Sequence, residues 1–258
     1  MTINSYIICT NPRSGSTLLC GLLAQTGVAG NPDSFFRGPS RQWWADHLQV
    51  AHAVDLSNPA FCASFLAAAR AEGKGDGDLF GRRLMHESLA DLIAMTSCLH
   101  PDLDDDLARI KAVFGQTAFV HLIREDKVDQ AISYVRAEQT GTWHVAPDGR
   151  AVEQKGPPQP PQYDFDRIHQ MVVEFEVHEA AWGEWFEQTG ARPLAVRYSD
   201  LAENPKHELL GILTHLDLPA KAADRATPGV RKLADALNKE WAARYRGDRK
   251  LHATHSLS

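Results

Sequence analysis

The sequence has few cysteines, no long apolar run and no excess of basic residues. Its four cysteines form no Cys-x-x-Cys pair and no cluster with histidine, so zinc is not expected and free thiols suit the cytoplasm. No run approaches the ~20 apolar residues of a membrane span, and the first residues lack the pattern of a signal peptide. A formal net charge of −6 disfavours a broad surface for nucleic acid or anionic membranes. Any bound anion must therefore be held locally.

Apolar strand-like runs alternate with helical patterns along the chain. The runs at 6–9, 79–85, 117–123 and 193–198 predict buried strands. Such alternation predicts an α/β fold with a parallel sheet, in which ligands lie at the carboxyl ends of the strands. With 258 residues, 43% of them apolar, we expect a single domain over 1–258.

Other segments are assigned from spacing and composition. Apolar residues recur at helical spacing over 165–186, which predicts core packing. The acidic run 102–106 predicts the start of a surface helix, because carboxylates suit the positive end of a helix dipole. Two excursions from the domain, 31–78 and 141–163, are rich in proline, glycine or aromatic residues. The second is expected to be a long loop or lid.

The sharpest motif is Thr-Asn-Pro-Arg-Ser-Gly-Ser-Thr at 10–17, between the first strand and an apolar helix. Ser14 to Thr17 would present successive backbone N–H groups to an anion at a helix N-terminus. Gly15 lets the backbone approach the anion closely. Arg13 can donate a forked pair of hydrogen bonds, and Ser16 and Thr17 can donate from their hydroxyls. This stretch therefore predicts an anion site.

The loop differs from the phosphate loop of nucleotide kinases. That motif, GxxxxGK[ST], has a glycine at its start and a lysine after its second glycine. The stretch at 10–17 has neither. A small-molecule kinase that uses ATP is therefore the weaker alternative.

Arg-Ser-Gly-Ser-Thr-Leu-Leu at 13–19 resembles the 5′-phosphosulfate loop of the sulfotransferases. The run at 26–36 resembles the trehalose 2-sulfotransferase family in particular. The resemblance implies a P-loop-NTPase-like three-layer sandwich around a central parallel sheet. It also implies transfer of a sulfuryl group from 3′-phosphoadenosine 5′-phosphosulfate (PAPS) to an acceptor hydroxyl of a carbohydrate or glycolipid. No metal is required, and a homodimer is expected.

The same family grips the nucleotide 3′-phosphate with an arginine at a strand end and a serine on the next helix. Here Arg124 follows the strand at 117–123, and Ser133 lies nine residues later. The resemblance therefore assigns both to the 3′-phosphate. The stretch at 240–246 resembles the family's C-terminal segment near the nucleotide, which adds Arg244 and Arg246 as candidates.

The sequence departs from this family at the expected general base. Where the resemblance implies a glutamate before two phenylalanines, this chain has Ser34. A serine of ordinary acidity cannot take that proton, so Asp33, His86 and Glu87 are alternative candidates. Arg83 stands where the family tends to have lysine and could stabilise charge on the sulfuryl group. The departure keeps open a second hypothesis, a nucleotide-binding protein of the same fold that has lost catalysis.

Several aromatic residues are candidates for an acceptor pocket, because aromatic rings stack on sugar faces. The same rings also fill cores, and for each ring taken singly core packing is favoured; for the adjacent Trp43 and Trp44 the two roles are equally weighted. These residues are Phe35, Phe36, Trp43, Trp44 and Trp143.

Overall fold

A computed structural model describes residues 2–145, 148, 151–154, 156–157, 159–229 and 236–255. Four of the described strands form one parallel sheet in the order β2-β1-β3-β6. The predicted central parallel sheet is thus confirmed. Its strands are β1 (Ser5–Thr10), β2 (Phe80–Met85), β3 (Thr117–Ile123) and β6 (Leu194–Arg197).

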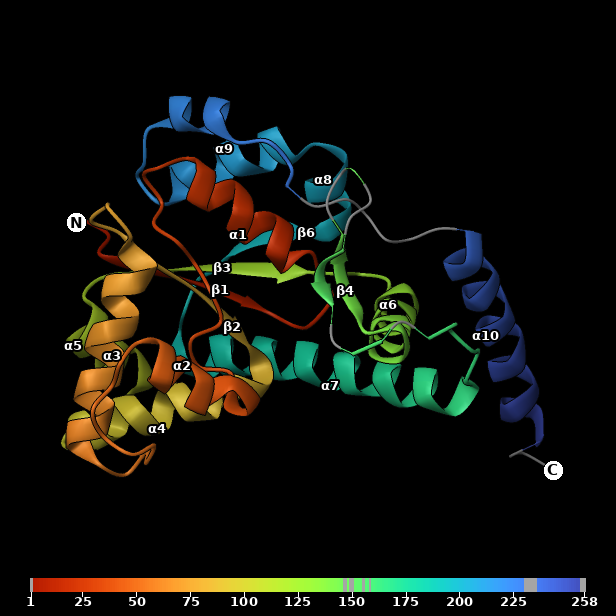
Figure 1. Cartoon of the computed structure of the whole chain (residues 1–258), viewed down its shortest axis with the longest axis horizontal. Coiled ribbons are helices and arrows are strands. Elements are labelled where there is room, and N and C mark those ends of the chain that lie inside the picture. Colours follow the sequence, from red (N-terminus) through yellow and green to blue (C-terminus); the bar gives the residue numbers. More distant parts are fainter. Residues whose placement is uncertain are drawn as a thin grey trace.

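Helices cover both faces of the sheet, which makes the predicted three layers (Figure 1). On β1 the side chains alternate: Tyr6 and Ile8 join one apolar cluster, and Ile7 and Cys9 join the other. One face is covered by α1 (Ser16–Gln25), α8 (Tyr198–Glu203), α9 (Pro205–His215) and the 3-10 helix η3 (Ala220–Arg225). The other is covered by α3 (Pro59–Lys74), α4 (Leu89–Leu99), α5 (Asp106–Phe114) and α7 (Phe165–Thr189).

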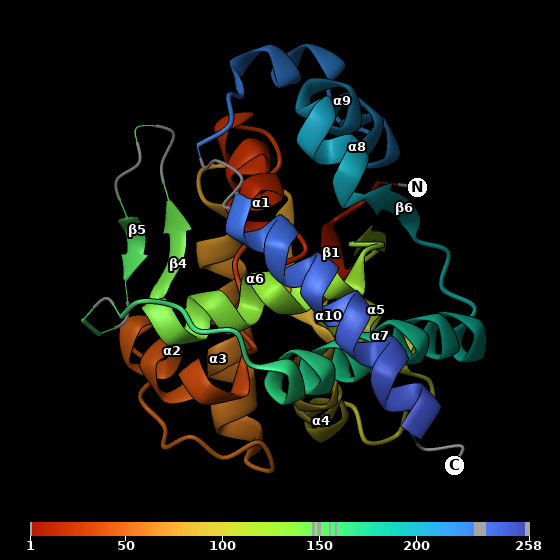
Figure 2. The same ribbon diagram turned by 90° about the vertical axis from the view of Figure 1, so that its right-hand side faces the viewer.

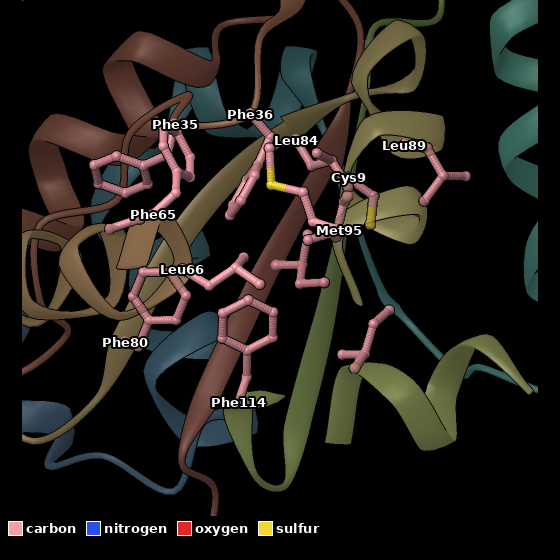
Figure 3. Packing of buried hydrophobic residues seen from close by; sticks show 14 of the residues in the cluster. Cys9, Phe35, Phe36, Phe65, Leu66, Phe80, Leu84, Leu89, Met95 and Phe114 are labelled. Carbon is pink, nitrogen blue, oxygen red and sulfur yellow. The ribbon is translucent and has the colours of Figure 1, made fainter. Parts of the chain in front are cut away.

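The 31–78 excursion is tied to the core by two of its phenylalanines (Figure 3). Phe35 and Phe36 are fully buried, and the Phe35 ring lies 6.2 Å from that of Phe80. They are therefore packing residues first. The excursion continues through the short helices η1 (Gly38–Ser40) and α2 (Arg41–His47) into α3. After β2, the 3-10 helix η2 (His86–Ser88) leads into α4.

Carboxylates begin several helices, as the sequence predicts for the acidic run. The Asp105 side chain accepts a hydrogen bond from the Ala108 N–H at 2.6 Å and so caps α5. Asp126 caps α6 (Lys127–Thr140) in the same way, with Asp129 N–H as the donor at 3.0 Å. Each cap satisfies an N–H group that the helix itself leaves without a partner.

The predicted helix over 165–186 is part of α7, and its apolar stripe packs in the core as expected. Ile168, Val172 and Phe175 contact a cluster that includes α6 and α10 (Ala236–His255), while Trp182 and Phe186 reach the core beside the sheet. In Figure 1, α10 lies beyond α6 and away from the sheet. Among the described residues, no helix is long and apolar enough to cross a membrane.

The predicted loop or lid at 141–163 is partly wrong. It contains an antiparallel hairpin of β4 (Thr142–Val145) and β5 (Ala151–Gln154), which stands beside α1 and α6 (Figure 2). β-Branched and aromatic residues in Thr-Trp-His-Val favour such a strand, although proline and glycine dominate the stretch around it. Residues 146, 147, 149, 150, 155 and 158 of the predicted loop lie outside the described residues.

Candidate functional site

The loop at 10–17 joins β1 to α1, as the motif predicts. Gly15 sits at the N-cap of α1 with φ 88° and ψ 10°, a left-handed conformation that favours glycine. A Cβ atom on Gly15 would lie 2.5 Å from the Tyr198 ring. Glycine is therefore needed here for two reasons, the backbone conformation and the close approach of an aromatic ring.

Hydrogen bonds within the loop and with two other segments, β3 and α6, hold the loop in place. The Thr10 hydroxyl contacts Ser14 Oγ at 2.5 Å and donates to the Leu122 carbonyl at 2.8 Å. Gln130 Nε2 donates to the Pro12 carbonyl at 2.6 Å. Ser14 is buried, so its hydroxyl serves the loop while Ser16 and Thr17 face the cavity described next. The loop is thus preorganised before any ligand binds.

A large cavity of about 1310 Å³ lies at the carboxyl ends of the strands, where α/β folds bind ligands. The first turn of α1 opens into it. Its cationic side chains outnumber its carboxylates in a chain of net charge −6. The cavity therefore favours an anionic ligand. The charged side chains that line it are Arg13, Arg37, Arg83, Arg124, Asp33 and Glu72.

Arg83 connects the start of α1 to the Asp33–Ser34 turn. Its Nε donates to Ser34 Oγ at 2.7 Å and its Nη1 to Thr17 Oγ1 at 3.0 Å. Its Nη2 lies 3.3 Å from Asp33 Oδ1. Asp33 also pairs with β2 through a backbone bridge at Arg82, which brings the turn to the sheet edge. The guanidinium therefore sits between the loop and the excursion, beside any group bound at α1.

The two predicted anion sites adjoin each other. Arg13 Nε donates to Ser133 Oγ at 3.1 Å, and Arg124 Nη1 donates to the Arg13 carbonyl at 2.8 Å. Arg13 Nη1 also donates to the Trp143 carbonyl. Burial lowers the pKa of Arg124, and its guanidinium lies 4.8 Å from the centre of the Tyr198 ring. All four predicted residues Arg13, Gly15, Arg124 and Ser133 line one cavity.

A salt-bridge cluster contacts the backbone of Arg124. Glu179 of α7 accepts a hydrogen bond from Lys127 Nζ at 2.9 Å, and its other oxygen lies 2.8 Å from His121 Nε2. Lys127 Nζ also donates to the Arg124 carbonyl at 2.6 Å. Burial alone would raise the pKa of Glu179, but the hydrogen bonds from His121 and Lys127 outweigh it and hold the pKa below its ordinary value. The cluster fixes the backbone that carries Arg124.

Five of the predicted site residues do not line the cavity: the buried Ser14 of the loop, and His86, Glu87, Arg244 and Arg246. His86 packs beside His178 and Trp182, and burial followed by the nearby His178 lowers its pKa. Glu87 pairs with Arg37 at 3.5 Å on the exposed side. Neither side chain borders the cavity.

The C-terminal arginines are engaged elsewhere on α10. The Arg244 guanidinium lies 3.9 Å from the centre of the Tyr163 ring, and Arg246 pairs with Asp126 at 2.8 Å. Because α10 packs on α6 and α7, these side chains cover the outer face of α6 and do not border the cavity.

The aromatic candidates divide between the cavity and the core. Phe36 is wholly in the core, while Phe35 borders the cavity from a buried position. Trp43 is 57% exposed and lies edge-on to Trp44 at 4.8 Å. Trp143 borders the cavity from β4. Trp43 and Trp44 from α2 and Trp143 from β4 thus give the cavity apolar lining.

Sequence reasoning missed His144 and Tyr198. His144 on β4 lines the cavity, and its Nε2 lies 3.1 Å from Thr17 Oγ1. Tyr198, at the start of α8, packs against both Gly15 and Arg124. The only signal for His144 was its place directly after Trp143, an aromatic candidate for the acceptor pocket.

Comparisons of the sequence with known proteins show the family of this chain. A model of the family described as Stf0 sulphotransferase matches residues 5–248. A trehalose 2-sulfotransferase of Mycobacterium tuberculosis (Erdman strain) is 30% identical over 264 residues, which cover 95% of this chain and 96% of that protein. One of Mycolicibacterium smegmatis is 29% identical over 269 residues, covering 95% of each. The sulfotransferase domain from the Synechococcus PCC 7002 olefin synthase superimposes with a TM-score of 0.46 at 17% identity, over 95% of this chain and 88% of that chain.

Proposed function

This chain belongs to the Stf0 sulphotransferase family, and we propose that it transfers a sulfuryl group from PAPS to a hydroxyl of a carbohydrate or glycolipid. The observation that carries the proposal is the shared cavity. Arg13, Arg83 and Arg124 meet there at the N-terminus of α1. Three arginines beside the backbone N–H groups at the start of α1 suit a donor with phosphate and sulfonate oxygens.

The donor substrate is divided between two parts of the cavity. Backbone N–H groups of 13–17, with the hydroxyls of Ser16 and Thr17, would hold the 5′-phosphosulfate. Arg124 and Ser133 would hold the 3′-phosphate. The hydrogen bond between Arg13 and Ser133 supports this division, because it places the two anion sites side by side, as one nucleotide requires. The free-energy cost of removing the donor's two phosphate groups from water is offset by their charge-assisted hydrogen bonds to the protein.

The chain's own groups would act mainly by position and charge. PAPS supplies the activated sulfuryl group when bound. Arg83 is placed to stabilise negative charge near Thr17, since its Nη1 is 3.0 Å from the Thr17 hydroxyl. Preorganised donors of this kind are the largest contribution in many transfer reactions, and removing one costs about 10²–10³ in kcat.

The acceptor is proposed to be a sugar. The two curated relatives are named for trehalose. The exposed Trp43 and the cavity-lining Trp44 and Trp143 offer ring faces on which a sugar can stack. At about 1310 Å³ the cavity also exceeds the ~300–1,000 Å³ of an ordinary ligand pocket. It therefore has room for an acceptor beside the donor.

A thermal melt tests the donor first. 3′-Phosphoadenosine 5′-phosphate at 100 times its Kd should stabilise the protein by about 2.7 kcal/mol, a melting shift of several degrees. Adenosine 5′-phosphate and ATP with magnesium serve as comparisons, and Arg124→Ala should abolish the shift. A preference for ATP would favour the kinase alternative and overturn the proposal. The shift should persist in EDTA if no metal holds the donor.

Turnover is tested next with PAPS and trehalose, by mass spectrometry of a sulfated sugar. Nucleotide binding without a product from any sugar tested would favour the hypothesis of a protein that has lost catalysis, which Ser34 motivates. A homodimer and a cytoplasmic location stay predictions from the resemblance and the free thiols. Light scattering of the purified protein tests the dimer.

A further inference from the structure

We infer that His144 is the general base that takes the proton from the acceptor hydroxyl. The inference rests on the proposed function and names the group that the Ser34 departure leaves unassigned.

Ser34 has a different role in this chain. Its hydroxyl oxygen accepts the hydrogen bond from Arg83 Nε at 2.7 Å, and the residue is buried. A hydroxyl that accepts from a guanidinium orients that cation, and its own basicity is far too low to remove a proton from another hydroxyl. Another residue on the cavity wall must therefore accept the proton.

His144 reaches the cavity from β4 of the hairpin and contacts Thr17 there. Its Nε2 lies 3.1 Å from Thr17 Oγ1, while Arg83 Nη1 donates to the same oxygen at 3.0 Å. Since Thr17 already accepts from Arg83, its hydroxyl can donate to His144 Nε2 in the tautomer with Nδ1 protonated, the one that a base acting through Nε2 requires. When the donor binds, the Thr17 hydroxyl turns to the 5′-phosphosulfate, and Nε2 is left to accept the proton of the acceptor hydroxyl.

The position also fits the chemistry of the cavity. Thr17 belongs to the first turn of α1, where the 5′-phosphosulfate is proposed to bind. A base beside Thr17 is therefore next to the reacting end of the donor. Histidine is the side chain most often used as a general base, and such a base contributes about 10²–10⁴-fold to rate.

The other candidates are worse placed. Asp33 Oδ1 accepts from the Ser34 N–H at 2.6 Å and faces Arg83 Nη2 at 3.3 Å, so this oxygen is already engaged by two donors. His86 and Glu87 do not border the cavity. Among the histidines that the structure describes, His144 is the one that lines the cavity.

In the sulfuryl transfer, the acceptor oxygen forms a bond to sulfur, and the bond between sulfur and the bridging phosphate oxygen breaks. That oxygen keeps the electron pair, which gives 3′-phosphoadenosine 5′-phosphate. The acceptor proton moves to His144 Nε2, and the imidazolium returns it to water after the sulfate ester leaves. No oxidant, reductant or metal takes part in this balance.

Kinetics of matched variants test the inference. His144→Gln keeps a hydrogen-bonding group beside Thr17 but cannot hold the proton. We expect its kcat to fall about 10²–10⁴-fold, with KM for PAPS and the melting shift with 3′-phosphoadenosine 5′-phosphate nearly unchanged. His207→Gln, at an exposed histidine on α9, should keep full activity. Unchanged kcat in His144→Gln, with a large loss in Asp33→Asn, would overturn the inference and assign Asp33.

A second readout does not depend on turnover. Nitrogen NMR of histidine-labelled protein, with His144→Gln to assign the signal, reports which ring nitrogen carries the proton. We expect Nδ1 protonated and Nε2 unprotonated; the reverse tautomer would contradict the inference. The two proposals fail differently. Absence of a melting shift in the unchanged protein overturns the proposed function, and with it this inference, whereas a normal shift and turnover with an active His144→Gln overturn only the role of His144.

Discussion

Arg83 Nε donates a hydrogen bond to Ser34 Oγ over 2.7 Å, so the residue at the expected base position is a partner of the cation. The same guanidinium reaches Thr17 and Asp33. The turn at 33–34 therefore positions a positive charge at the start of α1. The departure from the family pattern changes what this turn does, and it leaves the anion-binding loop unaltered.

Replacing Arg83 tests this role. Arg83→Met should lower kcat by about 10²–10³-fold, because the variant removes a preorganised donor beside the transferred group. Arg83→Lys should recover part of the loss, since an ammonium supplies the charge without the forked contacts to Ser34 and Thr17. Steady-state kinetics with PAPS and trehalose measure the effect. A loss of less than tenfold in Arg83→Met would show that the cation serves only packing.

Gly15→Ala should destabilise the protein and weaken donor binding. The left-handed backbone costs an ordinary residue about 1–2 kcal/mol, and the new Cβ would lie 2.5 Å from the Tyr198 ring. At about 2–4 °C per kcal/mol for a chain near this size, the melting temperature should fall by several degrees. Gly21→Ala is the matched control, because nothing lies within 4 Å of that position. Helix propensity predicts a gain of about 0.5–1 kcal/mol there.

Glu179→Gln should make the stability less dependent on pH in the acid range. The pKa of Glu179 lies below its ordinary value of 4.5, so its ionised form stabilises the folded state above that pH. The benefit is lost as the pH falls through the folded pKa. The variant should lose about 1.5–3 kcal/mol at pH 7, and the difference should shrink in acid. Urea unfolding across pH measures this, with the exposed Glu187→Gln as control. A constant difference would contradict the prediction.

Arg82→Met should stabilise the protein. Among the described residues its buried guanidinium has no hydrogen-bond partner, and it lies 3.8 Å from the centre of the Phe114 ring. Burial, opposed by the nearby Cys9, lowers the pKa of Arg82 to about 9. The unfolded chain therefore holds this proton more tightly, so the folded state carries the full penalty below pH 9 and less above it.

Urea unfolding at pH 7 should show a gain of about 1–4 kcal/mol for Arg82→Met. The gain should diminish as the pH rises above 9. The exposed Arg192→Met should leave the stability within about 0.5 kcal/mol. A destabilised Arg82→Met would mean that the guanidinium's contacts with the three neighbouring phenylalanine rings outweigh its burial.

Local patterns in the sequence were sufficient for the sheet and for the loop at 10–17. The four apolar runs became β1, β2, β3 and β6, because continuous apolar residues are what strands buried on both faces require. Arg13 and Gly15 were predicted from the loop motif, and Arg124 and Ser133 from the family resemblance. All four line one cavity at the carboxyl ends of the strands, and their roles in binding stay predictions. That residues 1–258 act as one domain stays a prediction.

The hairpin was not predicted from the sequence, because its proline- and glycine-rich surroundings are typical of loops. β4 and β5 also pair with irregular register, so no simple alternation marks them. The predicted residues His86, Glu87, Arg244 and Arg246 likewise lie outside the cavity lining. The directions of these side chains depend on how η2 and α10 pack, and the amino-acid composition does not predict this packing.

The sequence by itself determined the parallel sheet, the position of the loop at 10–17 between β1 and α1, and the membership of a sulfotransferase family, since each depends on residues close together in the chain. Only the tertiary structure decided which groups meet around Thr17. Arg83 and His144 lie 66 and 127 positions from it, and they converge because β2 ends beside β1 and the hairpin stands beside α1. Contacts between such distant segments come from packing of the whole core, and no local pattern specifies them.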